Sequence, residues 1–305
     1  MLYKDIYSIL KINGSLTRPF SVSRGIRQGC GLSGLLYAIS IEPLLVMLST
    51  VAAPGISQAP TVSLTAYADD VTVFLQSQED VQVLSQALQT YQRAASAKVN
   101  WEKCSSLLIG DWQDSTPPVL PQRCAWNLEG FKFLGVYLGT VGYMSKNWEG
   151  MEEKITGRLQ RWRWILPQLS YRGRVLVVNN LAASMLWHKA FVLDPPVSLL
   201  CSLQKAFVNF FWDGYHWLAP GVLCLPVAEG GQGLIHLASK VASMRLQTAQ
   251  CLLYAPDSVL WVSFARSVLH GIGAFSLDRH FFLMANIQWI QGFHLPFFFK
   301  SVLEA

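Results

Sequence analysis

Residues 62–75 read Val62-Ser-Leu-Thr-Ala-Tyr-Ala-Asp69-Asp70-Val-Thr-Val-Phe-Leu75. Two runs rich in β-branched and aromatic residues, 62–67 and 71–75, flank Ala68-Asp69-Asp70. Such runs on either side of a short turn segment predict an antiparallel β-hairpin. Because successive side chains of a strand alternate between its two faces, adjacent carboxylates can share one site only at the turn. We therefore expect Asp69 and Asp70 at the tip of a hairpin.

The chemistry of this acidic pair favours a metal site. Like charges this close raise each other's pKa unless a cation neutralises them. Mg²⁺ is bound in proteins through one or two carboxylates together with substrate phosphates. The pair therefore indicates phosphoryl or nucleotidyl transfer by a two-metal site, with Asp69 and Asp70 as catalytic residues and metal ligands. Asp-Asp is also a common turn pair, so a turn that merely faces solvent remains the alternative for the motif taken alone.

A second motif precedes the acidic pair. The segment Arg24-Gly-Ile-Arg27-Gln28-Gly29-Cys-Gly-Leu-Ser33 joins a short strand to a helix predicted over residues 32–48. Its glycines permit a nucleotide or template to approach the backbone closely, and free N–H groups at a helix start bind phosphate. Ser33 is the expected helix cap. The residues expected to face inward are Leu35, Leu36, Ile39 and Ile41.

These motifs, in this order, resemble the palm of the reverse transcriptases of vertebrate non-long-terminal-repeat (LINE-type) retrotransposons. Arg24–Ser33 is similar to the family's Gln-Gly motif, and Ala66–Asp70 is similar to its catalytic Tyr-x-Asp-Asp hairpin. Ala95–Asn100 resembles the lysine-bearing turn that follows, and Phe133–Val136 resembles the primer-grip hairpin. The four motifs cover residues 20–140, and a looser similarity continues into the helices beyond.

The resemblance implies RNA-directed DNA synthesis. It implies Mg²⁺ as cofactor, and an RNA template, a DNA primer and deoxynucleoside triphosphates as partners. Asp69 would ligate the catalytic ions, and Asp70 would be the weaker ligand near the primer end. The other residues carried over are Arg27, Gln28, Gly29, Tyr67 and Lys98 for the nucleotide and template, Leu134 and Gly135 for the primer, and Lys154, Arg158 and Arg161 for the duplex.

The sequence also departs from the family's pattern. Gly31 stands where the family has Pro, and Ala95-Ser96 replaces a Ser-Gly pair. The family's first catalytic aspartate lies in a strand before the Gln-Gly motif. Asp5 lies in the segment Tyr3–Tyr7, which resembles the helix that follows that strand in the family. We therefore reject Asp5 as the third metal ligand. We therefore expect an N-terminally truncated fragment with negligible polymerase activity alone. The alternatives are a non-catalytic nucleic-acid-binding remnant, a domesticated interaction protein, and a genomic fossil without function.

The expected fold is α+β. A partial polymerase palm with the primer-grip hairpin is expected over residues 1–140, and a helical thumb and C-terminal region over residues 141–305. Asn13-Gly14 is a typical hairpin turn. Helices are predicted over 79–97, 148–165, 175–190 and 197–212, a hairpin over 131–138, short strands at 99–101 and 105–109, and a turn at 230–233. In helix 148–165, Met151, Ile155, Leu159 and Trp162 are expected to face inward, and Lys154, Arg158 and Arg161 to lie on another face.

Composition narrows the class of protein. Of the 305 residues, 51% are hydrophobic and 14% are charged, which argues against disorder. The net charge of +5 lies entirely in residues 141–305 and favours a polyanionic partner. Six cysteines without metal-site spacing predict free thiols, with no disulfide partner.

We also expect an intracellular protein, nuclear or cytoplasmic. The N-terminus lacks the features of a signal peptide, and Pro43, Pro54 and Pro60 interrupt the uncharged stretch 43–68, which argues against a transmembrane span. His188 and His236 are expected to be ordinary histidines. The tryptophans expected to pack in the core are Trp162, Trp164, Trp187, Trp212 and Trp217.

Overall fold

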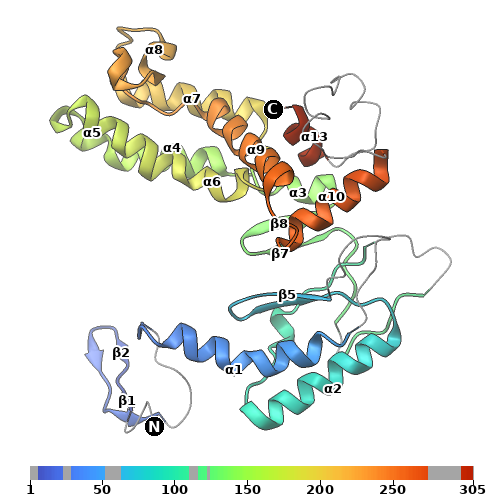
Figure 1. The fold of residues 1–305 in the computed structure, drawn as a ribbon. Coiled ribbons are helices and arrows are strands. Elements are labelled where there is room, and N and C mark those ends of the chain that lie inside the picture. The colour runs from blue at the N-terminus through green and yellow to red at the C-terminus, as the bar shows by residue number, and fades with distance from the viewer. Residues whose placement is uncertain are drawn as a thin grey trace. The chain divides into compact units, whose positions relative to one another are not determined.

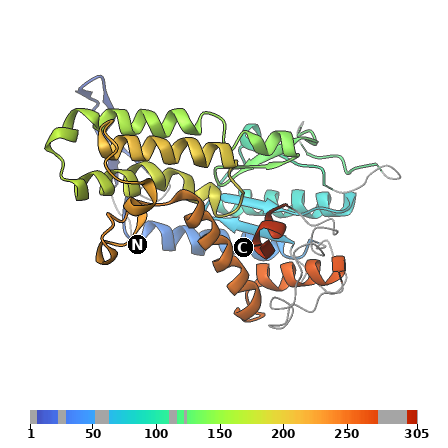
Figure 2. The ribbon, with the colours of Figure 1, turned by 90° about the horizontal axis from the view of Figure 1, so that it is seen from above.

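The structure, a computed structural model, describes residues 6–22, 29–51, 63–109, 116–121, 124–273 and 297–304. The chain divides into two compact units. Unit 1 comprises residues 1–54, 61–104 and 112–124, and unit 2 comprises residues 55–60, 105–111 and 125–305. In both units, helices combine with two-stranded antiparallel sheets (Figures 1 and 2), which confirms the α+β class. No helix within the described ranges has the length and apolar character to cross a membrane.

Unit 1 begins with two small ladders. β1 (Tyr7–Ser8) pairs with β4 (Phe20–Ser21), and β2 (Lys11–Ile12) pairs with β3 (Ser15–Leu16). Between β2 and β3, Asn13 and Gly14 have φ of 49° and 87°. Asn and Gly adopt this left-handed backbone at little cost, so the turn predicted at Asn13-Gly14 is confirmed.

The main packing of unit 1 joins α1 (Ser33–Leu48) to α2 (Gln78–Ala95) through Ile41, Leu44 and Leu48. The predicted inward face of α1 was partly wrong, because Leu35 and Ile39 are 65% and 71% exposed. These two residues are one turn apart and lie opposite Ile41, so a helix that packs through Ile41 must leave them outside. The expected cap was also wrong, because the N-cap position is held by Leu32.

Helix α2 begins with a capping box. The Ser77 hydroxyl accepts a bond from the Asp80 N–H, and the Asp80 carboxylate accepts one from the Ser77 N–H at 3.0 Å. The helix therefore starts close to its predicted position. The strand predicted at 99–101 was wrong, because Trp101–Lys103 forms a 3₁₀ turn closed by the Cys104 N–H bond to the Trp101 carbonyl. The segment 105–109 contributes a single β-bridge rather than a strand.

Unit 2 begins with the hairpin of β7 (Gly130–Phe133) and β8 (Val136–Gly139), followed by helices. In chain order these are α3 (Val141–Ser145), α4 (Met151–Trp162), the 3₁₀ turn η2 (Arg163–Gln168), α5 (Tyr171–Leu176), the π-helical η3 (Val177–Ala183), α6 (Ser184–Ala190), α7 (Val197–Trp212), α8 (Pro220–Cys224), η4 (Val227–Glu229), α9 (Leu237–Tyr254), α10 (Leu260–Gly273) and α13 (Phe297–Glu304).

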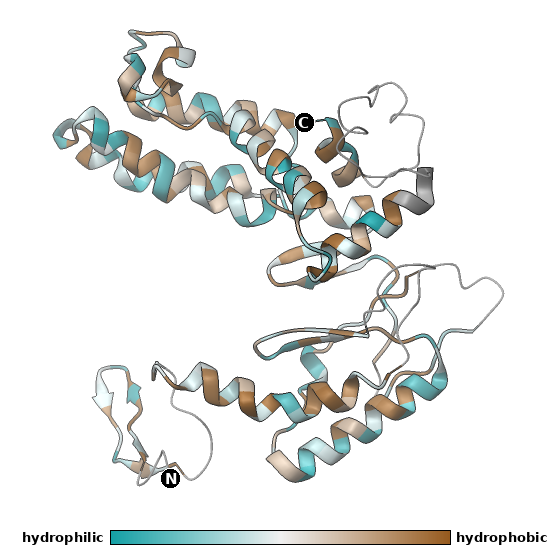
Figure 3. Cartoon of the chain, in the orientation of Figure 1, coloured by the Kyte–Doolittle hydropathy of each residue, from teal (hydrophilic) through white to brown (hydrophobic). Residues whose placement is uncertain are grey.

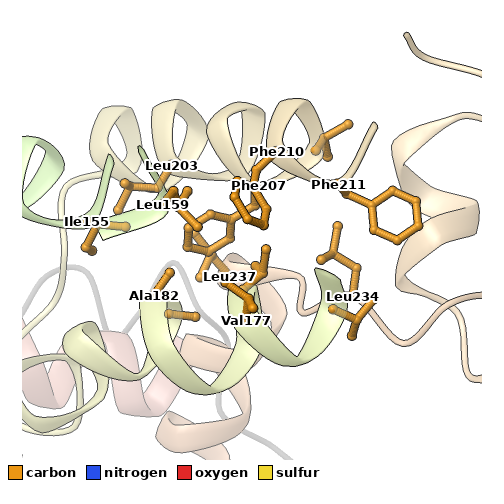
Figure 4. Close-up of a cluster of buried hydrophobic side chains, with 14 of the residues drawn as sticks. Ile155, Leu159, Val177, Ala182, Leu203, Phe207, Phe210, Phe211, Leu234 and Leu237 are labelled. Atoms are coloured by element: carbon orange, nitrogen blue, oxygen red, sulfur yellow. The ribbon is translucent and has the colours of Figure 1, made fainter. Parts of the chain in front are cut away.

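The largest core lies among α4, η3 and α7. Ile155 and Leu159 of α4 meet Phe207 of α7 there, with Leu234 and Leu237 from the chain after η4 (Figure 4). Hydrophilic and hydrophobic residues alternate along α4 (Figure 3), as expected for a helix with one buried face. The predicted inward positions Met151, Ile155 and Leu159 are therefore confirmed.

The tryptophans divide into buried and exposed sets. Trp212 is buried and Trp187 packs against the core, as predicted. The prediction was wrong for Trp164 and Trp217, which are 75% and 74% exposed, and for Trp162, which is 37% exposed. Trp162 and Trp164 leave the buried stripe because the α-helical period ends at Trp162, where the tighter η2 turn begins.

The glycine-rich segment 230–233 is a turn, as predicted. A Cβ on Gly231 would overlap the Leu225 backbone carbonyl. The Gly231 N–H donates to the Pro226 carbonyl at 3.1 Å, and the Gly233 N–H donates to the Leu225 carbonyl at 2.9 Å. Only glycine allows this close approach of two backbones, which leads into the buried Leu234.

Arg245 of α9 fixes the end of α6. Its guanidinium is buried and donates to the Ala190 carbonyl at 2.8 Å and to the Leu193 carbonyl at 2.9 Å. It also pairs with the Asp194 carboxylate at 2.8 Å, which balances its charge. The last turn of α6, with His188 and Lys189, is thereby held in place.

Candidate functional site

The acidic pair lies at the tip of the hairpin formed by β5 (Leu64–Tyr67) and β6 (Asp70–Val73). Tyr67 pairs with Asp70 at the end of the ladder, so Ala68 and Asp69 form a two-residue turn. Asp69 and Asp70 are both exposed. The hairpin predicted from the sequence is confirmed, with Asp69 in the turn and Asp70 as the first residue of β6.

The backbone at this tip is strained. Ala68 has φ +52°, a left-handed conformation that costs an L-residue other than glycine about 1–2 kcal/mol. Its methyl side chain cannot offset that cost with a local hydrogen bond, as Asn or Asp can. Sparsely populated backbone conformations concentrate at active sites, so the strain agrees with a functional role for this turn.

Sequence reasoning missed Tyr37 of α1 as a neighbour of Asp69. Burial raises the pKa of the Tyr37 hydroxyl, and the charges of Asp69 and Tyr91 raise it further. The Asp69 carboxylate therefore lies near enough to Tyr37 for its field to act on that hydroxyl. The Tyr91 hydroxyl of α2 donates to the Ser40 carbonyl at 3.1 Å and fixes the two helices behind this site. The sequence places Tyr37 one turn into the helix after the glycine-rich motif, but that position alone does not indicate a role.

The other residues expected around the nucleotide are only partly described. Arg27, Gln28 and Asp5 lie outside the described residues. Gly29 has φ +82°, so the glycine motif does contain a left-handed turn. Lys98 is exposed in the segment after α2 and, among the described residues, forms no ion pair that joins it to the acidic hairpin. In the same described part, no group of three or more acidic, His or Cys side chains could hold a metal ion.

The β7–β8 hairpin carries the predicted primer contacts. Leu134 and Gly135 form its two-residue turn with φ of 46° and 84°. The Nε2 atom of His188 lies 2.7 Å from the Leu134 carbonyl oxygen. Because a carbonyl oxygen can only accept, the imidazole donates this bond. His188, expected to be an ordinary histidine, therefore ties α6 to the turn. The sequence gives no signal of this, since the two residues are 54 positions apart.

Asn147, between α3 and α4, also ties this hairpin to the helices. Its side chain is fully buried and accepts the Tyr137 N–H at 2.9 Å. Its amide donates to the Tyr137 carbonyl at 2.7 Å and to the Met144 carbonyl at 2.9 Å. Lys189 of α6 donates to the Asn147 backbone carbonyl at 2.8 Å. Asn147 therefore acts as a strand-like partner for the outer edge of β8.

Positive charge gathers beside the hairpin. The Lys132 and Lys189 ammonium groups lie 5.4 and 5.8 Å from the centre of the Tyr137 ring. Burial lowers the pKa of Lys189, and the charges of Lys154 and Lys132 lower it further. Within the described residues, none of these three lysines forms an ion pair with a carboxylate. Three uncompensated cations are suited to bind a polyanion such as a phosphate backbone.

The predicted basic face of α4 is present. Lys154, Arg158 and Arg161 are all exposed, whereas Ile155 and Leu159 of the same helix are buried. In the described part of the chain they have no carboxylate partner. The face is therefore available to a polyanion.

Comparison with known proteins shows a similarity to polymerases of mobile elements. Residues 2–138 match the family described as reverse transcriptase (RNA-dependent DNA polymerase). The N-terminal part of the chain is therefore similar to reverse transcriptases. A 149 kDa protein of transposon TX1 from Xenopus laevis, described as uncharacterized, is 36% identical over 99% of this chain and 24% of its own length. The resemblance to non-long-terminal-repeat retrotransposon reverse transcriptases is thus confirmed.

Two further relatives are retrovirus-related Pol polyproteins of R2 retrotransposable elements. The protein from Drosophila melanogaster is 24% identical over 77% of this chain and 23% of its own length. The protein from Popillia japonica is 24% identical over 45% of this chain and 24% of its own length. The chain therefore spans about a quarter of the length of each relative.

Proposed function

We propose that this chain carries the metal-binding and primer-holding parts of an RNA-directed DNA polymerase. Residues 1–140 would be a palm with the primer-grip hairpin, and the helices of residues 141–305 a thumb and C-terminal region. The observation that carries the proposal is the β5–β6 hairpin, which presents Asp69 in a strained, solvent-exposed turn with Asp70 next to it.

In this proposal Asp69 and Asp70 hold divalent metal ions, with Mg²⁺ as the physiological ion. When bound, such ions would supply activation of a hydroxyl nucleophile and neutralisation of phosphate charge for nucleotidyl transfer. Asp69 would supply oxygen ligands from the turn, and Asp70 would supply them from the start of β6. Tyr67, which is 67% exposed and pairs with Asp70, would contact the nucleotide, and Lys98 would neutralise the triphosphate.

The β7–β8 hairpin would hold the primer strand through the backbone of Leu134 and Gly135. His188 acts here as a positioning residue, because its bond to the Leu134 carbonyl fixes the turn to α6. Lys132 and Lys189 would bind primer phosphates beside the turn, and the basic face of α4 would continue this contact along the duplex. RNA template, DNA primer and deoxynucleoside triphosphates are thus the proposed substrates.

Primer extension on an RNA template tests the proposal. The chain is assayed with Mg²⁺ or Mn²⁺, alone and together with any in-frame sequence found upstream of Met1, because the family resemblance implies a third carboxylate before the Gln-Gly motif. Asp69→Asn should abolish extension and weaken Mn²⁺ binding while leaving affinity for the RNA–DNA hybrid intact. Asp213→Asn, at an exposed left-handed position in unit 2, is the matched control. It should change neither primer extension nor Mn²⁺ binding. Extension that survives Asp69→Asn contradicts the proposal.

The second candidate function is a non-catalytic nucleic-acid-binding protein. The uncompensated Lys132, Lys154 and Lys189 favour it, because polyanion binding at these lysines does not require the acidic hairpin. Hybrid binding with no extension in either form of the protein, and with no Mn²⁺ binding that depends on Asp69, would assign this function instead.

A further inference from the structure

One end of unit 2 carries an exposed aromatic and basic surface, which we name the Arg-Trp surface. It is formed by Arg163 and Trp164 of η2, Tyr171 and Arg172 of α5, and Tyr215 and Trp217 after α7. Trp164, Tyr215 and Trp217 are 75%, 74% and 74% exposed, and half of Tyr171 is exposed. Large aromatic side chains concentrated in this way on a surface mark an interaction site.

Several contacts join the η2 and α5 part of this surface to the end of α7. The Arg163 Nε atom lies 3.9 Å from a carboxylate oxygen of Asp213. The Tyr171 ring stacks on Phe211 with centroids 5.2 Å apart. Arg174 donates to the Phe211 carbonyl at 2.7 Å and to the Leu166 carbonyl at 3.0 Å. In Figure 1, α5 and α8 accordingly lie at the same end of the helices of unit 2.

The surface is held rigidly beneath its exposed rings. Besides the stack on Phe211, Tyr171 meets the Trp212 ring edge-on at 5.7 Å, and the Arg174 guanidinium lies 5.5 Å from the Tyr171 ring centre. The Leu169 N–H closes η2 with bonds to the Ile165 and Leu166 carbonyls. The Tyr171 ring is therefore fixed in orientation, and the η2 turn that carries Trp164 is closed by hydrogen bonds.

The charge around these rings is positive. Arg163 and Arg172 are exposed on this surface, and Arg174 lies beside the Tyr171 ring. Between Asp194 and Glu229 the chain has a single carboxylate, that of Asp213. The surface thus combines cations with exposed aromatic faces, and it complements a polyanion that carries free aromatic rings of its own.

We propose that the Arg-Trp surface binds single-stranded RNA, with unpaired bases stacked on Trp164 and Trp217 and phosphates paired with Arg163 and Arg172. Aromatic side chains along a basic groove bind single strands in this way because every unpaired base offers a π-face. In a duplex each base is already stacked between its neighbours, so exposed indoles gain little from it. The choice of RNA rests on the proposed function, in which an RNA strand is the template.

Fluorescence anisotropy with a labelled, unstructured oligouridine tests the inference. Trp164→Ala and Trp217→Ala should each weaken binding about tenfold, as expected for the loss of one stacked base, and Trp164→Phe should restore most of the affinity. Trp261→Ala, on α10 and 48% exposed, is the matched control and should bind like the wild type. Arg172→Gln should reduce the salt dependence of log affinity by about one unit of slope.

Further arms separate this inference from its alternatives. Affinity for an RNA–DNA hybrid should not change in Trp164→Ala, and affinity for oligouridine should not change in Asp69→Asn. If the tryptophan variants lose oligouridine affinity but the protein shows no primer extension, the single-strand-binding surface is supported. Only the polymerase proposal is then contradicted. Equal oligouridine binding by Trp164→Ala, Trp217→Ala and the wild type overturns the inference and leaves a protein partner for this surface. Stronger binding of oligodeoxythymidine than of oligouridine overturns the assignment to RNA.

Discussion

Replacing Asn147 by Ala should detach the β7–β8 hairpin from the helices of unit 2. The side chain is fully buried and makes three hydrogen bonds of 2.7–2.9 Å to the Tyr137 N–H, the Tyr137 carbonyl and the Met144 carbonyl. Each such bond contributes about 0.5–1.5 kcal/mol, and buried groups left without a partner cost more, so we expect a loss of about 2–4 kcal/mol. Asn147→Asp should be at least as destabilising at neutral pH, because its carboxylate would face both carbonyl oxygens.

The assay combines urea unfolding with hydrogen exchange at the Tyr137 amide. Exchange there should accelerate with the loss of stability, because the Asn147 side chain accepts that N–H. Asn180→Ala is the matched control, since Asn180 is exposed in the same unit and its side chain makes no hydrogen bond among the described residues. It should change stability by less than about 0.5 kcal/mol. The reasoning is refuted if Asn147→Ala falls within that range or leaves the exchange of the Tyr137 amide unchanged.

Gly231→Ala should lower the free energy of unfolding by about 2–4 kcal/mol, because the new Cβ would overlap a backbone carbonyl and displace the turn. Gly221→Ala, where a Cβ meets open space within a helix, should be neutral or slightly stabilising, and equal unfolding midpoints for the two variants would contradict this account. Ala68→Gly should stabilise the acidic hairpin by about 1 kcal/mol, measured as slower amide exchange in its ladder, because glycine adopts φ +52° without strain. Asp69→Asn should lower the pKa of Tyr37 while leaving it above 10.0, because burial is the largest cause of the raised pKa. A titration of ¹³C-labelled tyrosine measures this, and an unchanged Tyr37 curve would place Asp69 away from α1.

The sequence predicts the secondary structure of this protein best at its hairpin turns and long helices. Asn13-Gly14, the turn between β5 and β6, and α7 all follow from local rules of turn chemistry and apolar periodicity, which act within a few residues. Local patterning does not predict which side of a helix is buried when apolar residues lie on more than one side. Leu35 and Ile39 fit an apolar stripe, but only the packing of α1 against α2 shows that this stripe lies outside.

The same division holds at the site. The amino-acid order alone places two carboxylates in a turn and a basic, carboxylate-free stretch, residues 154–193, in the helical half. Charge and turn preference are properties of neighbouring residues. Only the tertiary structure shows that the Asp69 charge raises the pKa of Tyr37 and that His188 donates a hydrogen bond to the Leu134 carbonyl. It also shows that the Asn147 side chain pairs with the backbone of β8 as a neighbouring strand would. Each of these joins residues far apart along the chain. Such contacts depend on how whole helices pack, and no local pattern encodes that packing.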